Sequence, residues 1–216
     1  MPPRADRDLF AISDIAETTA RLFGVDHERT KIMNRQVRNL VTQQLVGVTE
    51  RRGGRGDAYM NDREAAKAVL QLALIDTGFD ATMLREVVKL FDLAVDSRLR
   101  GLPIAIDGYS PPRALDVVLR DVACTTSRAW ELVVYVRRDT ETGERFVFGG
   151  FARADQEPWP VDDPRSMRGD AADGVASHEG TYGDDGKVRW TRRGPLLTIA
   201  EIRIPATELL FPIVRG

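Results

Sequence analysis

Residues 33–62 read MNRQVRNLVTQQLVGVTERRGGRGDAYMND, and this stretch decides how the N-terminal half of the chain is interpreted. It passes from an amphipathic segment into a loop rich in arginine and glycine, and then into a second helix-like segment. Four apolar residues recur at steps of three and four, the spacing of one helix face: Val37, Leu40, Val41 and Leu45. The sequence therefore predicts a helix around residues 34–45 with a basic exposed side.

The arginine-glycine loop that follows predicts a β-hairpin. Gly53, Gly54 and Gly56 lie between short β-favouring pieces at residues 47–49 and 58–60, so the hairpin would have a flexible tip and project as a wing. Asn61, followed three residues later by Glu64, has the form of a capping box. It predicts a strongly apolar helix over residues 65–75 that Gly78 ends.

Further helices are predicted on both sides of this stretch. The apolar spacing of residues 12–23 predicts a first helix that stops at Gly24, and residues 25–31, VDHERTK, read as a polar connection. Asp80 is the predicted N-cap of the next helix, which carries a long apolar stripe: Leu84, Val87, Val88, Phe91, Val95 and Leu99. Another helix is predicted over residues 112–122, with Ser110 as its cap.

From residue 125 onward the sequence favours β-structure. The segments 130–138 (WELVVYVRR) and 145–152 (RFVFGGFA) are rich in aromatic and β-branched residues and predict a hairpin, with Gly149-Gly150 as a kink or bulge. Residues 187–193 and 196–205 predict two further strands. Residues 155–185 hold nine acidic side chains against two arginines and predict a long acidic loop.

These segments predict an α+β chain, with a helical winged-helix domain first and a β-rich module after it. The expected divisions are a flexible tail at 1–11, the winged-helix domain at 12–100, a connecting helix at 101–124 and the β-rich module at 125–216. The 216 residues suffice for such an arrangement with packed cores.

Composition limits the environment and the partners of the chain. The formal net charge is -2, so any affinity for nucleic acid must come from a local excess of positive charge. The single cysteine, Cys124, excludes an internal disulfide framework and favours a reducing, cytoplasmic compartment. The sequence contains no apolar run of the length that a secretion signal or a membrane span needs, so we expect no membrane association.

Such a local excess is found in residues 29–56, which contain seven basic side chains against the single acid Glu50. Arg35 and Arg38 would face the same way on a helix and could reach phosphate or a guanine edge. Asn34 and Gln36 carry amides suited to adenine, and the hairpin arginines suit the DNA backbone or the minor groove. The alternative is a solvated charge run with no ligand.

The order of these pieces resembles the MerR-type winged helix-turn-helix DNA-binding domain. In NRQVRNLVTQQLV, residues 34–46, the residues Arg35, Val37, Arg38, Leu45 and Val46 take the places of that family's second-helix pattern. Asn39 and Leu40 stand where the family has an aromatic pair, and Gln44 stands where it has glycine. The Arg/Gly tip is similar to the family's wing, and Tyr59 leads into the following helix as in the family.

The resemblance implies a sequence-specific transcription regulator that binds double-stranded DNA as a homodimer. Its C-terminal module would sense an unidentified small molecule or a protein. The residues expected to contact DNA are Lys31, Asn34, Arg35, Gln36, Arg38, Arg51, Arg52, Arg55 and Tyr59. Two alternatives stay open: a DNA-architectural or recombination directionality factor, and a protein-interaction module derived from a winged helix.

The sequence argues against an enzyme. His27 and His178 are the only histidines, no metal-ligand spacing occurs, and Gly149-Gly150 does not form a phosphate-binding pattern. We therefore expect no catalytic residues, no metal and no cofactor. Trp159, in the acidic loop, is the aromatic residue that stands out as a possible ligand contact.

Overall fold

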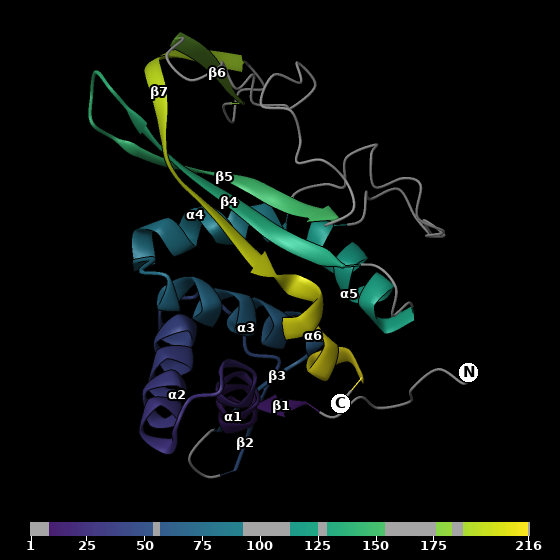
Figure 1. Ribbon diagram of the computed structural model, residues 1–216. Coiled ribbons are helices and arrows are strands. Elements are labelled where there is room, and N and C mark those ends of the chain that lie inside the picture. Colours follow the sequence, from purple (N-terminus) through teal and green to yellow (C-terminus); the bar gives the residue numbers. More distant parts are fainter. Residues whose placement is uncertain are drawn as a thin grey trace.

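The computed structural model describes residues 9–53, 57–92, 113–124, 129–153, 176–182 and 188–215, and only the backbone over 176–182 and 188–196. Figure 1 shows helices and antiparallel strands together, which confirms the predicted α+β class. In chain order the elements are β1 (Phe10–Ala11), α1 (Ile12–Phe23), α2 (His27–Thr42), β2 (Glu50–Arg52), β3 (Asp57–Met60), α3 (Asp62–Asp76), α4 (Ala81–Phe91), α5 (Ala114–Cys124), β4 (Trp130–Asp139), β5 (Arg145–Arg153), β6 (Ala176–Tyr182), β7 (Val188–Pro205) and α6 (Ala206–Arg215).

Local capping fixes most helix ends where the sequence predicts them. Gly24 ends α1 in the left-handed region at φ 63, and its N–H bonds back to carbonyls of the last turn. The Asn61 side chain accepts the N–H of Glu64 at 3.0 Å and begins α3. Asp80 caps α4 by accepting the N–H groups of Thr82 and Met83. The predicted continuation of α4 to Leu99 and the predicted cap Ser110 lie outside the described residues.

The second helix differs from its prediction at both ends. α2 begins at His27, so the polar connection expected over residues 25–31 is wrong: Asp26 accepts the N–H of Arg29 at 2.8 Å and caps the helix there. The helix ends at Thr42 rather than near residue 45. Gln44 turns into the left-handed region at φ 58, and the N–H of Leu45 bonds to the Leu40 carbonyl at 2.9 Å.

A three-stranded antiparallel sheet of order β1-β3-β2 lies beside these helices. It contains the predicted hairpin, but β2 begins at Glu50 rather than at residue 47. The sheet also takes in Phe10 and Ala11 from the expected tail, because they pair with Met60 and Tyr59 of β3.

The C-terminal part forms a four-stranded antiparallel sheet of order β5-β4-β7-β6. The β4–β5 hairpin is confirmed, and its register runs without a bulge through Gly149 and Gly150, where the sequence predicts one. The two strands expected at 187–193 and 196–205 are one strand, β7. Residues 176–182, expected in the acidic loop, pair with β7 as β6, so the loop prediction is wrong for them. The described part of the chain contains no other residue of that loop.

One hydrophobic core joins the two halves of the chain. It extends from Ile15 of α1 to Val214 of α6, and the apolar run from Ala65 to Leu74 of α3 is buried at its centre. In Figure 1 the four-stranded sheet lies on one side of α3 and α4, while α1, α2 and the small sheet lie on the other. The core therefore continues across residue 125, where the sequence divides the chain. None of the described helices has the length and apolar character needed to cross a lipid bilayer.

Candidate nucleic-acid interface

The helix pair α1 and α2 presents one side of α2 to solvent. The two helices are joined by only Gly24, Val25 and Asp26, a tight connection of the kind found in helix-turn-helix units. Met33 of α2 packs with Ala16 and Ala20 of α1, and Val37 and Leu40 enter the main core. Because these residues fix the inner face of α2, the side chains of the opposite face are exposed.

Arg35 and Arg38 occupy that exposed face and differ from the neighbouring cations. Neither of them forms an ion pair with any residue that the structure describes, and both are exposed. In contrast, Lys31 pairs with Glu28 at 2.7 Å. Arg29 pairs with Asp76 of α3 at 2.6 Å. Two of the predicted contact residues are thus cations without a protein counter-ion in the described structure.

A shallow hollow of about 400 Å³ lies along α2 beside α1. Its lining brings together four of the residues expected from the sequence: Lys31, Asn34, Arg35 and Arg38. His27 and Thr30 of α2 also line it, and Glu17 of α1 adds one carboxylate. Gln36 is half-buried and does not line the hollow. Its three certain cations against one carboxylate give this hollow a positive charge suited to an anion.

The predicted hairpin arginines divide into three environments. Arg51 and Arg52 belong to strand β2, not to a flexible tip, and both are exposed. Arg52 donates to Glu50 at 2.8 Å and lies over the Tyr59 ring. That hydrogen bond lowers the pKa of Glu50. Arg55 lies outside the described residues. Tyr59 is half-buried on β3, between the buried Ala58 and Met60.

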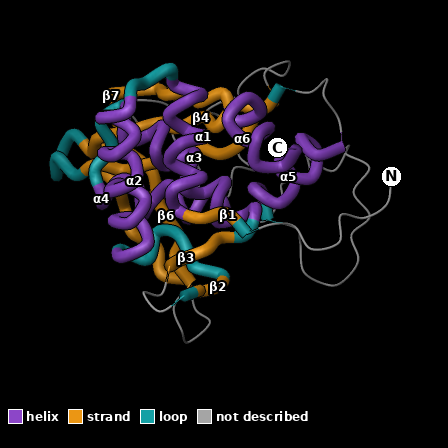
Figure 2. Tube along the Cα trace, turned by 90° about the horizontal axis from the view of Figure 1, so that it is seen from below, coloured by secondary structure: helices purple, strands orange, loops and turns teal. Residues whose placement is uncertain are grey.

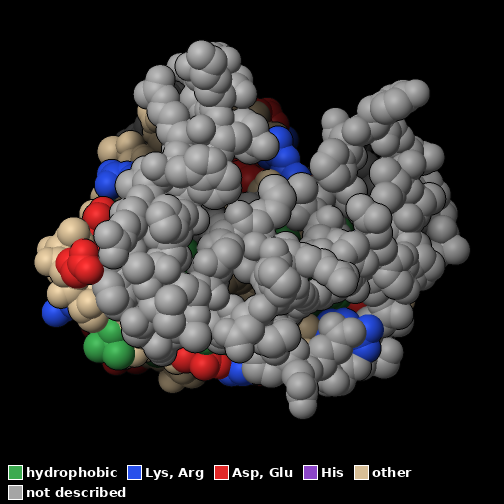
Figure 3. Space-filling model, turned by 90° about the horizontal axis from the view of Figure 1, so that it is seen from above, with side chains coloured by type: hydrophobic (Ala, Val, Ile, Leu, Met, Phe, Trp, Pro, Cys, Tyr) green, Lys and Arg blue, Asp and Glu red, His purple; other side chains and the backbone are tan. Residues whose placement is uncertain are grey.

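The basic face of α2 and the hairpin occupy the same end of the molecule (Figures 1 and 2). Figure 3 shows the opposite end, where the described acidic and basic side chains are interspersed. The fold therefore brings together, at one end, a helix and a β-hairpin that both carry arginines, separated in sequence by residues 43–49.

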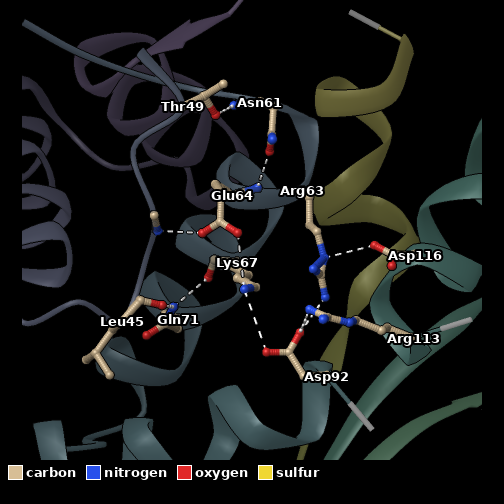
Figure 4. A network of polar contacts seen from close by, with 11 residues as sticks. Leu45, Thr49, Asn61, Arg63, Glu64, Lys67, Gln71, Asp92, Arg113 and Asp116 are labelled. Atoms are coloured by element: carbon tan, nitrogen blue, oxygen red, sulfur yellow. Dashed lines mark hydrogen bonds and ion pairs between the residues drawn. The ribbon is translucent and has the colours of Figure 1, made fainter. Parts of the chain in front are cut away.

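A polar network at the base of the hairpin was not predicted from the sequence. Glu64 does not complete the capping box, because its carboxylate accepts the N–H of Gly47 instead of that of Asn61. The N–H of Asn61 donates to Thr49 Oγ1 at 2.9 Å. Gln71 donates to the Leu45 carbonyl at 3.2 Å. Figure 4 shows these side chains between the α2–β2 connection and α3.

The same network continues away from the hairpin through ion pairs. Lys67, only 8% exposed, lies 3.1 Å from Glu64 Oε1 and 3.9 Å from Asp92 Oδ2. Arg63 pairs with Asp92 and, at 2.9 Å, with Asp116 of α5. One signal could have revealed this network. Lys67 and Gln71, four residues apart, are the polar residues of an otherwise apolar stretch, AAKAVLQLAL, residues 65–74.

Neither metal ligation nor a relative gives a further indication of function. Within the described ranges, no group of three or more His, Cys, Asp or Glu side chains could hold a metal ion. Trp159, expected as a possible ligand contact, lies outside them. No protein-family model matches the chain, and neither do the curated proteins or solved structures compared with it.

Proposed function

We propose that this protein binds double-stranded DNA through α2 and the β2–β3 hairpin, and that it regulates transcription. The exposed face of α2 would enter the major groove, which is about 12 Å wide and accepts a helix. The hairpin would lie on the flanking backbone or in the minor groove. In this arrangement α2 supplies the base contacts and the hairpin arginines supply phosphate contacts.

One observation carries the proposal: Arg35 and Arg38 share the exposed face of α2 and have no ion-pair partner in the described structure. A side chain that already has a counter-ion must give it up before it neutralises a phosphate. Arg35 and Arg38 have no such contact to lose, so they are the cations best suited to replace condensed counter-ions on DNA. They also carry the fork of donors that pairs with guanine.

Lys31 contributes to the same surface after a small rearrangement. Its pair with Glu28 joins two side chains that are both more than half exposed. Exposed pairs of this kind contribute about 0–1 kcal/mol, which one phosphate contact can replace. Asn34, half-buried in the hollow, lies next to Arg35 in sequence and has the amide suited to adenine.

The backbone at the end of α2 supports the MerR-type resemblance. Gln44 stands where the family pattern has glycine, and it takes φ 58, a conformation that glycine adopts without strain. The short α1–α2 connection and the hairpin after α2 follow the order of a winged helix-turn-helix unit. By the resemblance, two copies would read two half-sites about one helical turn apart.

The direct test is the salt dependence of binding to randomised duplex DNA by the full chain. Replacing Arg35→Ala and Arg38→Ala together should remove two phosphate or base contacts. We expect affinity to fall by about 10- to 100-fold and the slope of log K against log salt to become shallower by up to about 2. Arg51→Ala with Arg52→Ala should weaken binding to all sequences by a similar factor.

The charge-matched control is Arg85→Ala with Arg120→Ala, on α4 and α5. Both arginines are exposed, and this double variant makes the same change in net charge. It should leave the slope near that of the wild type. If the α2 variant and this control give the same slope, α2 is not the DNA-binding surface. Binding of a protein with no affinity for DNA would instead favour an interaction module.

The regulatory part of the proposal has its own test. Genomic fragments that the full chain selects should be sequenced, and protected sites should be mapped by footprinting. Two half-sites within promoter regions would support a transcription regulator. Sites confined to recombination loci, with DNA bending and no effect on transcription, would favour an architectural factor.

A further inference from the structure

The base of the hairpin is attached to α3 at three successive points. Gln71 holds the Leu45 carbonyl at 3.2 Å. Glu64 accepts the Gly47 N–H. Asn61 donates its N–H to Thr49 Oγ1 at 2.9 Å. The chain between α2 and β2 is therefore fixed against the first half of α3, and Glu64 holds the middle point (Figure 4).

Glu64 and Gly47 fit together closely. A Cβ placed on Gly47 would lie 3.1 Å from Glu64 Oε2 and 3.2 Å from its carboxyl carbon. Contacts at that distance require a neighbouring group to move. A displacement of the Glu64 carboxylate would consequently move the backbone that leads into β2.

The position of Glu64 depends in turn on a buried cation. Its second oxygen lies 3.1 Å from the Lys67 ammonium, and both side chains are largely buried. A buried charge that loses its partner is costly, so the two side chains should move together. Lys67 also lies 3.9 Å from Asp92, at the end of α4.

Asp92 links this pair to α5. Besides Lys67 it pairs with Arg63 and, at 3.4 Å, with Arg113, and Arg63 also pairs with Asp116 in the first turn of α5. All of these partners lie outside the hairpin. A connected set of charges thus extends from the hairpin base to α5, which packs against α6 and β5 (Figure 4).

We propose that Glu64 is the positioning residue of the DNA-binding hairpin, and that the Lys67–Asp92–Arg63 ion pairs couple the hairpin to α5. This inference rests on the proposed DNA-binding function. A shift of α5 or of the end of α4 would change the partners of Lys67, and through Glu64 it would change how firmly the hairpin is held. Firm attachment favours binding, because less conformational freedom is lost when the hairpin meets DNA.

Hydrogen exchange of the backbone amides of residues 47–60, measured in the full chain, tests the coupling without DNA. Glu64→Gln keeps the shape of the side chain but removes the charge that pairs with Lys67. Asp92→Asn makes the corresponding change at a site that touches no hairpin residue in the contacts above. We expect exchange in the hairpin to become about 3- to 10-fold faster in both variants.

The matched control is Glu86→Gln, which removes the exposed Lys89 pair on the same helix as the residue preceding Asp92. If Asp92→Asn accelerates hairpin exchange no more than Glu86→Gln does, the coupling is overturned. The double variant Glu64→Gln/Asp92→Asn should exchange no faster than the faster single variant, because both act through one contact; additive effects would contradict the proposal. Should Glu64→Gln not fold, Asp92→Asn, with its side chain 37% exposed, decides the question alone.

DNA binding gives the second measurement. Asp92→Asn should weaken affinity about 3- to 10-fold in the wild-type background and have no effect when Arg51→Ala and Arg52→Ala are present, because its action passes through the hairpin. An equal loss in both backgrounds would indicate general destabilisation and overturn the positioning role. If the wild-type chain does not bind DNA at all, the proposed function fails, while the exchange measurement still decides the coupling.

Discussion

The guanidinium carbon of Arg52 lies 4.9 Å from the centre of the Tyr59 ring, diagonally across the β2–β3 hairpin. The same guanidinium donates to Glu50 at 2.8 Å, and this bond lowers the pKa of the Glu50 carboxyl. Glu50 is therefore ionised at neutral pH and remains so below the ordinary glutamate pKa. The ring orients Arg52, while the carboxylate reduces the positive charge that the hairpin offers to DNA.

Replacing Glu50→Gln should strengthen DNA binding by about 2- to 5-fold. The change removes the only acid in residues 29–56 and releases Arg52 for a phosphate, which should also steepen the salt slope by up to about 1. Fluorescence anisotropy with a randomised duplex at several salt concentrations measures both quantities. Glu86→Gln, on α4, makes the same charge change elsewhere. Equal effects of the two variants would show that only net charge matters.

Gln44→Gly should stabilise the protein by about 0.5–1 kcal/mol. Gln44 adopts φ 58, where a side chain is strained and glycine is not. The free energy of unfolding in urea measures the gain. Gln43→Gly is the neighbouring control: Gln43 has φ -83, so glycine relieves no strain there and should destabilise the protein. If both changes destabilise the protein, the left-handed turn after α2 is not strained.

Much of the fold follows from local sequence signals, and the exceptions have physical reasons. Gly24, Asn61 and Asp80 set helix ends in the structure as predicted, because caps act within one turn. The start of α2 was misplaced because residues 27–31 are polar on every side. Its helical pattern becomes visible only once Asp26 is identified as the cap. α6 was missed because Pro212 interrupts its ten residues.

The candidate interface was predictable in part. A helical period was enough to place Arg35 and Arg38 on one face, because that period depends only on the local chain. Which cations have counter-ions was not predictable, since Arg29 reaches Asp76, which lies 47 positions away in sequence. The network around Glu64 depends on Asp92 and Asp116 in the same way. Long-range polar contacts of this kind leave only the weak signal of Lys67 in an apolar helix.

Tyr135 should give the protein a measurable sensitivity to alkaline pH. Burial raises the pKa of Tyr135, and the nearby Glu201 carboxylate raises it further. An acid with a raised pKa in the folded state keeps its proton while the unfolded chain loses it. Stability should accordingly decline as pH rises from the ordinary tyrosine pKa to that of Tyr135, and it should be unaffected below this window.

Ultraviolet titration of the folded protein measures this ionisation, and Tyr135→Phe identifies its share of the signal. Glu201→Gln should lower the Tyr135 midpoint towards the ordinary tyrosine value without abolishing the shift, because burial is the larger cause. A midpoint that does not move in Glu201→Gln would contradict the electrostatic contribution. A midpoint at the ordinary value in the wild type would contradict the burial of the phenol.

Gly149 and Gly150 are adjacent in β5, and alanine should have opposite consequences at the two positions. Gly149 has φ 141, and a Cβ there would lie 2.0 Å from the Val133 carbonyl oxygen of β4. Neither backbone can move without breaking the β4–β5 ladder, so Gly149→Ala should destabilise the protein by at least about 3 kcal/mol. At Gly150 a Cβ would meet no atom within 4 Å, and Gly150→Ala should change stability by less than about 1 kcal/mol. Urea unfolding of the two variants measures the difference. Similar values for both would mean that the approach of β5 to Val133 is looser than the structure has it.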